Sequence, residues 1–384
     1  MNNLRLSGLL LFLAGSIALM GIITAEALPT SSATVASPLT QIPQLETATS
    51  SFPSDQHIIF KVDTYLSKLT KARLFSGSVL IARNGKVLLS QGYGEADRQK
   101  HLVNTAQTKF RLGSMTKQFT AMAILILQTR GKLNVHDRIC TYLSGCPTAW
   151  HQITIHQLLT HTSGIPDFTR FPDFQATQRS PSSPTETIAR FKDKPLAFQP
   201  GEKFSYSNSG YVVLGAIIEQ ASGKRYEAFL QENIFVPLQM VDSGYDNNND
   251  GLAIGYRDQT NLADFIDMSV PYAAGGLYST VEDLYRWDQA LYTDKLIPKD
   301  LRDKMFTPFA LIPDGGGSGP GYGWFIGKEG DRPVVSHIGG IQGFSSSIAR
   351  YPNDKVVIIV LGNREDVNSG DIGVQLAKIV FGKK

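Results

Sequence analysis

The 384-residue sequence contains little of what several protein classes require. Charged residues make up only 18% of it, and Lys and Arg are spread without a basic run, which argues against nucleic-acid binding. No His-Glu-x-x-His or Cys-x-x-Cys pattern occurs, so we expect no zinc site. A Gly-x-Ser-x-Gly motif is also absent, which disfavours the α/β-hydrolase fold.

Cysteine is scarce as well. Only Cys140 and Cys146 occur, in the segment CTYLSGC. In an exported protein they would meet an oxidising compartment, where a short local disulfide is plausible. So small a loop would stabilise the fold by only about 2 kcal/mol. The alternative is two free thiols packed under a helix, and the sequence leaves both readings open.

The N-terminus has the features of a secretory signal peptide. Arg5 is an early cation, and an apolar stretch follows at 9–23. Ala25-Glu26-Ala27 is an Ala-x-Ala-like cleavage site, so we predict that residues 1–27 are removed and that the mature protein is periplasmic or secreted. The alternative is an uncleaved membrane anchor, because the apolar stretch is near the lower limit for spanning a bilayer.

The remaining chain divides into a linker and one folded domain. Residues 28–54 are rich in Ser, Thr, Pro and Ala without periodicity, which predicts a disordered linker. Hydrophobic residues make up 42% of the chain, enough to fill a large core in residues 55–384. Strand patterns lie at both ends of this domain and helical patterns within about 110–300. We therefore predict an α/β (α+β) fold with an all-helical subdomain beside one sheet.

That sheet is expected to be antiparallel. The stretch GSVLIARNGKVLLSQGYG predicts two strands joined by a turn at Asn84-Gly85. Four apolar runs after residue 321 are spaced like a meander, with PNDK as the last turn. Helical spacing before the hairpin, in DQHIIFKVDTYLSKLTKARL, and at the end of the chain, in DIGVQLAKIVF, predicts a helix at each place.

The segment LGSMTKQFT contains the first candidates for chemistry. Apolar residues recur with helical spacing from Phe119 onward, which places Ser114 in the first turn and Lys117 on the same face, about 5–6 Å away. A lysine kept neutral by burial or by a nearby cation can be the base for a serine nucleophile. Free N–H groups at a helix start favour developing negative charge. Taken alone, the pattern is better explained by an N-cap serine and a solvated lysine.

A second motif is YSNSG, which contains Tyr206 and Asn208. It follows the turn QPGEKF, which would hold both side chains on a fixed loop before a helix. A phenol can relay a proton, and an amide can orient substrate and lysine. The alternative is a loop tyrosine half buried against that helix.

A third motif is SHIGG, with His337, Gly339 and Gly340 at the end of a predicted strand. Glycines there let a substrate approach the backbone, so the Gly340 N–H could join the Ser114 N–H as an oxyanion hole. The alternative is a hairpin turn with an incidental histidine. His161, in LLTHTSG, is expected to cap a helix end or to hydrogen-bond a loop.

The three motifs, in this order, resemble those of the class C β-lactamase-like serine hydrolases, which include penicillin-binding-protein-like peptidases, β-lactamases and esterases. The segments LLTHTSGIPD, YSNSGYVVLGAIIEQASG and AAGGLYST add to the resemblance, which covers about residues 55–380. It implies a β-lactamase/transpeptidase-like fold: an antiparallel sheet flanked by helices, a helical subdomain, and an active site between them without metal or cofactor.

The resemblance also implies an acyl-enzyme mechanism. Ser114 would attack a carbonyl carbon, with Lys117 and Tyr206 sharing proton transfer. Asn208 would hold the substrate amide, and the Ser114 and Gly340 N–H groups would bind the oxyanion. Water would then release the product.

One departure from the family pattern bears on the substrate. Antibiotic-degrading members have Lys-Thr/Ser-Gly where this chain has His337-Ile338-Gly339. A lysine is a permanent cation for a substrate carboxylate, whereas a histidine with a pKa near ~6.5 is only partly charged at neutral pH. We expect ester, amide or small D-amino-acid peptide substrates, including cell-wall fragments, rather than efficient β-lactam turnover. The alternative is a non-catalytic or slowly acylated protein that binds penicillin or senses peptidoglycan.

Overall fold

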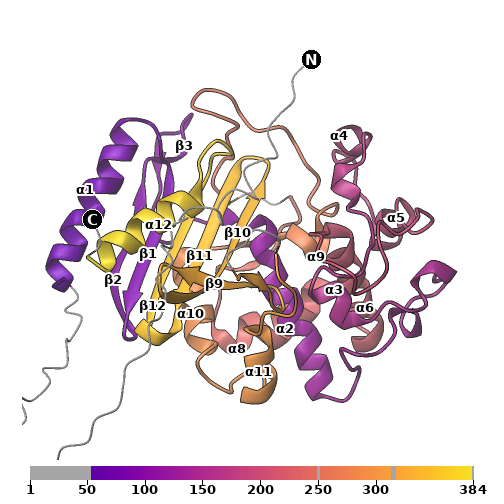
Figure 1. The fold of residues 1–384 in the computed structure, drawn as a ribbon. Helices are drawn as coiled ribbons and strands as arrows, with labels where there is room; N and C mark the ends of the chain where they lie inside the picture. Colours follow the sequence, from indigo (N-terminus) through magenta and orange to yellow (C-terminus); the bar gives the residue numbers. More distant parts are fainter. Residues whose placement is uncertain (1–52, 249–250, 313–316, 383–384) are drawn as a thin grey trace, which may run out of the picture.

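The computed structural model describes residues 53–248, 251–312 and 317–382 (Figure 1). The predicted signal peptide, and the predicted linker apart from its last two residues, lie outside the described residues. No helix within the described ranges is long and apolar enough to cross a bilayer.

The two ends of the domain build one seven-stranded antiparallel sheet, in the order β2-β1-β12-β11-β10-β9-β8. Its strands are β1 (Gly77–Arg83), β2 (Lys86–Tyr93), β8 (Gly319–Pro320), β9 (Phe325–Glu329), β10 (Arg332–Ile341), β11 (Phe344–Tyr351) and β12 (Val356–Gly362). The predicted hairpin is confirmed, since Asn84 and Gly85 both have positive φ, as its tight turn requires. The predicted meander is confirmed as well, with the turn Pro352–Asp354 before β12.

Helices cover both faces of this sheet. Helices α1 (Asp55–Lys71) and α12 (Ser369–Val380) pack on one face, and α10 (Val281–Ala290) packs on the other. The strand β1 shows why: Val79 and Ile81 join the core under α1 and α12, whereas Leu80 and Ala82 join the core on the α10 side. The ends of the described chain meet in the first of these layers, where a Cβ built on Gly382 would lie 3.1 Å from Pro53.

The remaining helices lie mainly on the other side of the molecule from the α1–α12 layer, with α3, α4, α5, α6 and α9 grouped there (Figure 1). They are α2 (Thr116–Thr129), α3 (Ile155–Leu159), α4 (Phe174–Thr177), α5 (Pro184–Ala189), α6 (Asn208–Ser222), α7 (Tyr226–Leu230), α8 (Val236–Leu238), α9 (Tyr272–Gly275) and α11 (Lys299–Met305). Short 3-10 turns occur at Gly113–Met115, Ile139–Thr141, Thr148–Trp150, Phe168–Arg170 and Pro352–Asp354, and a π-helical turn at Gln231–Phe235. The predicted fold class, an antiparallel sheet with helices, is confirmed.

The helix α2 explains why the segment after Ser114 is so apolar. Every residue from Thr116 to Leu127 is buried, because α2 packs against α6 and α9 and belongs to the same core as the inner face of the sheet. A helix that is apolar all round is typical of such a central position. It ends before Gly131, which has a φ of 64°.

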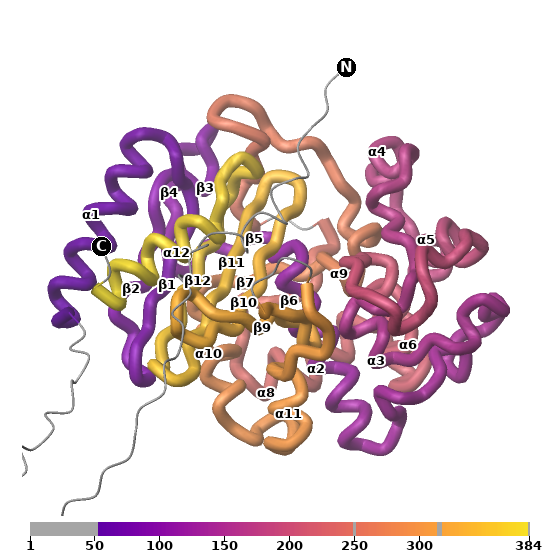
Figure 2. The backbone as a smooth tube through the Cα atoms, viewed as in Figure 1, coloured from indigo at the N-terminus to yellow at the C-terminus, as the bar shows by residue number. Residues whose placement is uncertain are grey.

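Several short strands were not predicted. The strands β5 (Phe110–Arg111), β6 (Gly244–Tyr245) and β7 (Leu277–Ser279) form a small sheet near the middle of the molecule (Figure 2), and β3 (Glu95–Asp97) pairs with β4 (Leu102–Val103). The structure also joins Cys140 to Cys146 as a disulfide, with an S–S distance of 1.98 Å.

Candidate active site

Ser114 and Lys117 face each other, as the helical spacing predicts. Ser114 lies in the 3-10 turn Gly113–Met115, which leads directly into α2, and Lys117 is the second residue of α2. The Lys117 Nζ lies 3.1 Å from the Ser114 Oγ, a hydrogen-bond distance. The serine side chain stays partly exposed, so its hydroxyl is accessible to a ligand.

The amine of Lys117 is completely buried. Its Nζ donates to the Asn208 Oδ1 and to the Ala274 carbonyl oxygen, both at 2.8 Å. Burial lowers the pKa of Lys117 to about 7, against the opposing effect of the Asp167 carboxylate. The cause is therefore burial, one of the two that the sequence suggested, and a substantial fraction of Lys117 is neutral at pH 7.

The second motif meets this pair from the start of α6. The Tyr206 ring lies 4.9 Å from the Lys117 Nζ, and its hydroxyl is buried without a hydrogen bond of ordinary geometry. Burial raises the pKa of Tyr206, while the nearby Ser114 hydroxyl acts in the opposite direction, so the phenol is protonated at neutral pH. The Tyr206 hydroxyl therefore lies close to Ser114 without a strong hydrogen bond, and it can donate to an atom that reacts there.

His161 holds the loop that carries Tyr206. Its ring stacks on the Tyr206 ring with centroids 4.4 Å apart, and its Nδ1 accepts a hydrogen bond from the Ser207 N–H at 3.1 Å. The expectation that His161 hydrogen-bonds a loop is met. Because Nδ1 is the acceptor and burial lowers the pKa of His161, the ring is neutral and carries its proton on Nε2.

The glycines of the third motif let the end of β10 pack against the turn that carries Ser114. A Cβ built on Gly339 would lie 2.0 Å from the Leu112 carbonyl oxygen, and one built on Gly113 would lie 3.0 Å from the Gly340 nitrogen. Gly340 itself is exposed and open on its outer side. The backbone of Gly340 therefore lies directly beside the turn that contains Ser114.

His337 is not the partly charged group that the sequence suggested. Its side chain is 3% exposed, and its Nδ1 donates to the Ile338 carbonyl oxygen at 2.6 Å. Burial, reinforced by the charge of Lys117, lowers the pKa of His337 to about 3. The expectation of partial charge at neutral pH is wrong, because it assumed a solvated ring.

Two site residues were not identified from the sequence. Asp167 accepts hydrogen bonds from the Asn208 side chain, and the Ala274 carbonyl oxygen accepts one from Lys117. Both lie in segments that carry the family resemblance, LLTHTSGIPD and AAGGLYST, which was the only signal available. Every residue has a backbone carbonyl, so residue type cannot show which carbonyl accepts a hydrogen bond from Lys117.

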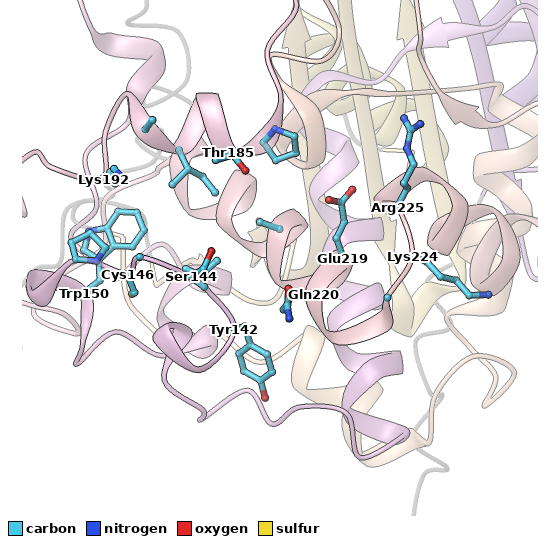
Figure 3. Close-up of a pocket in the computed structure, with 18 residues that line it drawn as sticks. Tyr142, Ser144, Cys146, Trp150, Thr185, Lys192, Glu219, Gln220, Lys224 and Arg225 are labelled. Atoms are coloured by element: carbon cyan, nitrogen blue, oxygen red, sulfur yellow. The ribbon is translucent and has the colours of Figure 1, made fainter.

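A separate pocket of about 610 Å³ lies away from these residues (Figure 3). The disulfide loop, α5 and the C-terminal part of α6 form its walls, with Ser144, Cys146, Lys192 and Glu219 among the lining residues. None of the residues from the three motifs lines it, so this pocket is distinct from the candidate active site.

A model of the family described as Beta-lactamase matches residues 62–377. The chain belongs to the beta-lactamase family. It is 30% identical over 328 residues to "Penicillin-binding protein 4*" of Bacillus subtilis (strain 168), which covers 79% of this chain and 72% of that protein. This beta-lactamase family member is a serine hydrolase, and its relatives include penicillin-binding-protein-like hydrolases.

Two solved structures illustrate the shared fold of this beta-lactamase family member. The octameric penicillin-binding protein homologue from Pyrococcus abyssi has a TM-score of 0.76 at 30% identity and covers 85% of this chain and 78% of that one. The D-stereospecific amidohydrolase from Streptomyces sp. has a TM-score of 0.72 at 24% identity and covers 86% and 100%, respectively. The second likeness is one of fold alone.

Proposed function

We propose that the chain hydrolyses esters, amides or small D-amino-acid peptides through an acyl-enzyme formed on Ser114, and that it prefers substrates without a carboxylate next to the scissile bond. The observation that carries this proposal is the hydrogen bonding of Lys117. A neutral amine has two N–H donors and one lone pair. The Asn208 Oδ1 and the Ala274 carbonyl oxygen take the two donors, so the lone pair points to the Ser114 hydroxyl, 3.1 Å away.

Each step of the reaction then has a group to support it. As the Ser114 Oγ forms a bond to the carbonyl carbon, its proton passes to Lys117, and the Ser114 and Gly340 N–H groups stabilise the oxyanion. Collapse of the intermediate breaks the bond to the leaving group, which takes a proton from Tyr206 or Lys117. Water then attacks the acyl carbon and gives a proton to Lys117. The bond from this carbon to the Ser114 Oγ breaks, the proton returns from Lys117 to the Oγ, and the acid is released.

The neutral His337 supports substrates that lack a carboxylate next to the scissile bond. No permanent cation occupies the position where antibiotic-degrading relatives have lysine, and the His337 imidazole is uncharged and buried. A carboxylate held there would lack a charged partner, which is costly in a partly desolvated site. The fold shared with a D-stereospecific amidohydrolase is compatible with this substrate class.

Export is part of the proposal. It is supported by the signal-like N-terminus and by the Cys140–Cys146 disulfide, because disulfides persist mainly in oxidising compartments. An uncleaved N-terminal anchor remains the alternative form of the exported protein.

Intact-mass spectrometry tests the proposed function. We expect a stable fluorophosphonate adduct on Ser114, a short-lived acyl adduct from a short-chain ester, and at most slow acylation by penicillin. Fragmentation of the first adduct locates the modified residue. A long-lived penicillin adduct without ester turnover would instead support the sensor function, and absence of every adduct would contradict both.

The pH dependence of ester hydrolysis provides a second test. Lys117 must be neutral to accept the proton, and its pKa is lowered to about 7. We therefore expect kcat/KM to rise about tenfold per pH unit well below pH 7 and to level off above it. With a free lysine as the base, the rise in kcat/KM would level off only above about pH 10.4. A profile that stays flat down to pH 5 would contradict the assignment of Lys117 as the base.

A further inference from the structure

The carboxylate of Asp167 lies behind Asn208, on the side away from Lys117. Its side chain is 6% exposed. The Asn208 Nδ2 lies 3.4 Å from the Asp167 Oδ1 and 3.2 Å from the Oδ2, and the Asn208 backbone N–H also donates to Oδ1, at 3.4 Å. Thr169 donates to the same Oδ1 from its backbone N–H and from its hydroxyl. Asp167 therefore accepts hydrogen bonds from both the main chain and the side chain of Asn208.

These contacts determine which way the Asn208 amide points. The Nδ2 group faces the acceptors Asp167 and Thr169, whose Oγ1 lies 3.3 Å away, so the Oδ1 faces Lys117. A flipped amide would place its oxygen against the carboxylate and its NH₂ against the amine of Lys117. That arrangement loses the three hydrogen bonds of Nδ2 and the one that Lys117 donates to Oδ1, and it opposes like partial charges, so the carboxylate excludes it.

The loop that carries Asp167 is fastened to α6 by other groups. The Ser209 hydroxyl donates to the Pro166 carbonyl oxygen at 2.7 Å and accepts from the Phe168 N–H at 3.0 Å. The loop therefore retains anchors when Asp167 is replaced. The Asn208 N–H at the start of α6 donates to the Asp167 carboxylate, which therefore also lies at the anion-favouring end of this helix, where the Ser207 side chain makes no cap hydrogen bond.

We propose that Asp167 is a positioning residue for hydrolysis: it fixes Asn208 so that the lone pair of Lys117 points to Ser114, and its negative charge favours the protonated form of Lys117. The inference rests on the proposed role of Lys117 as the base. Asp167 itself touches neither Ser114 nor Lys117 through a hydrogen bond in the structure, so it acts through Asn208 and through its electric field.

The other titratable side chains near Lys117 are neutral, so the Asp167 carboxylate is the charge that affects the protonation of Lys117. The rings of Tyr206, before α6, and Tyr211, within α6, have their centroids 4.9 and 5.4 Å from the Lys117 Nζ. His161, after α3, and His337, on β10, are near enough for the charge of Lys117 to lower their pKa values. Burial lowers the pKa of both histidines and raises the pKa of both tyrosines, so all four rings are neutral at pH 7. The exposed Arg170, whose Nε lies 3.8 Å from the Asp167 Oδ2, partly offsets the carboxylate.

Two substitutions separate the two effects of Asp167. Asp167→Asn keeps an oxygen that accepts from Asn208 but removes the charge. We expect the acid limb of kcat/KM to move down by about 0.5–1 pH unit, because Lys117 loses the anion that favours its protonated form. The plateau kcat should stay within about threefold, since the main acceptor oxygen is retained. Asp167→Ala removes the acceptor as well, and kcat should fall about 10- to 100-fold with little change in KM.

The control is Asp303→Asn, which removes an exposed carboxylate on α11 that pairs with Lys299. It should leave both the limb and the rate unchanged. A role in helix capping alone would lower the melting temperature of the Asp167 variants without moving the limb. The inference is overturned if the limb of Asp167→Asn coincides with that of the parent, or if Asp167→Ala keeps the parental kcat.

A measurement without activity separates this inference from the proposed function. Lysine labelled with ¹³C at Cε reports the titration of Lys117 by NMR, assigned with a Lys117→Met variant. We expect the titration midpoint of Lys117 to be about 0.5–1 pH unit lower in Asp167→Asn than in the parent, which is the shift expected for the acid limb of kcat/KM. If Ser114→Ala still hydrolysed esters, the proposed function would fail while this titration still tested Asp167. An unchanged midpoint would reject the electrostatic role even if the enzyme is active.

Discussion

Ser114→Ala is expected to lower kcat/KM for ester hydrolysis by about 10⁴-fold or more, because the proposed acyl-enzyme forms on the hydroxyl that it removes. The Ser114 hydroxyl is partly exposed, and its Oγ lies 3.1 Å from the Lys117 Nζ, within hydrogen-bond distance. Its removal leaves Lys117 with two other acceptors, at Asn208 and Ala274. The fold should therefore be retained, and the loss should appear in the chemistry alone. Initial rates with a chromogenic ester, together with a thermal melt, measure both.

The matched control is Ser144→Ala, which removes an exposed hydroxyl from the wall of the separate pocket (Figure 3). It should hydrolyse the ester at the parental rate. Activity that survives in Ser114→Ala after repurification to remove contaminating hydrolases would reject Ser114 as the nucleophile. Loss of the fluorophosphonate adduct in the same variant would support it independently of turnover.

Lys117→Arg is expected to lower kcat by about 10³-fold although it preserves a basic side chain. The guanidinium is effectively always protonated, so it has no lone pair with which to accept the proton of Ser114. Lys117 is also fully buried, and its two acceptors are placed for a compact amine. Rates measured between pH 6 and 10 should show no recovery at high pH, because the arginine does not deprotonate there.

Lys117→Met distinguishes loss of the base from strain caused by a bulkier cation. Methionine fills a similar volume without a charge, so its variant should fold at least as well while its kcat falls to a comparable degree. Lys132→Arg, at an exposed position after α2, is the control and should be unaffected. If Lys117→Met retained more than about a tenth of the parental rate, another group would have to be the base.

The sequence predicted the parts of the fold that depend on local pattern. The turn at Asn84-Gly85 follows from residue type, because both positions require positive φ. The spacing of Ser114 and Lys117 follows from helix geometry, and it brings their side-chain atoms to 3.1 Å. Longer strands and helices can be predicted from the spacing of their apolar residues, as the strands of the C-terminal meander were.

Features that depend on distant contacts escaped prediction for physical reasons. The strands β5, β6 and β7 have two or three residues each, too few for a period of two to be visible. Asp167 acts on Asn208 across 41 positions in the chain, and no local pattern reveals such a pair. The charge of His337 depends on how deeply its ring is buried, which residue type does not specify.

The meeting of Pro53 with Gly382 has a practical consequence. Both ends enter the layer of α1 and α12, which the sheet separates from the core that contains Met115 and α2. A tether, reporter protein or solid support joined next to Pro53 or Gly382 would thus attach on the opposite side of the sheet from Ser114. Immobilised in this way, the molecule would present its reactive hydroxyl toward the solution rather than toward the support.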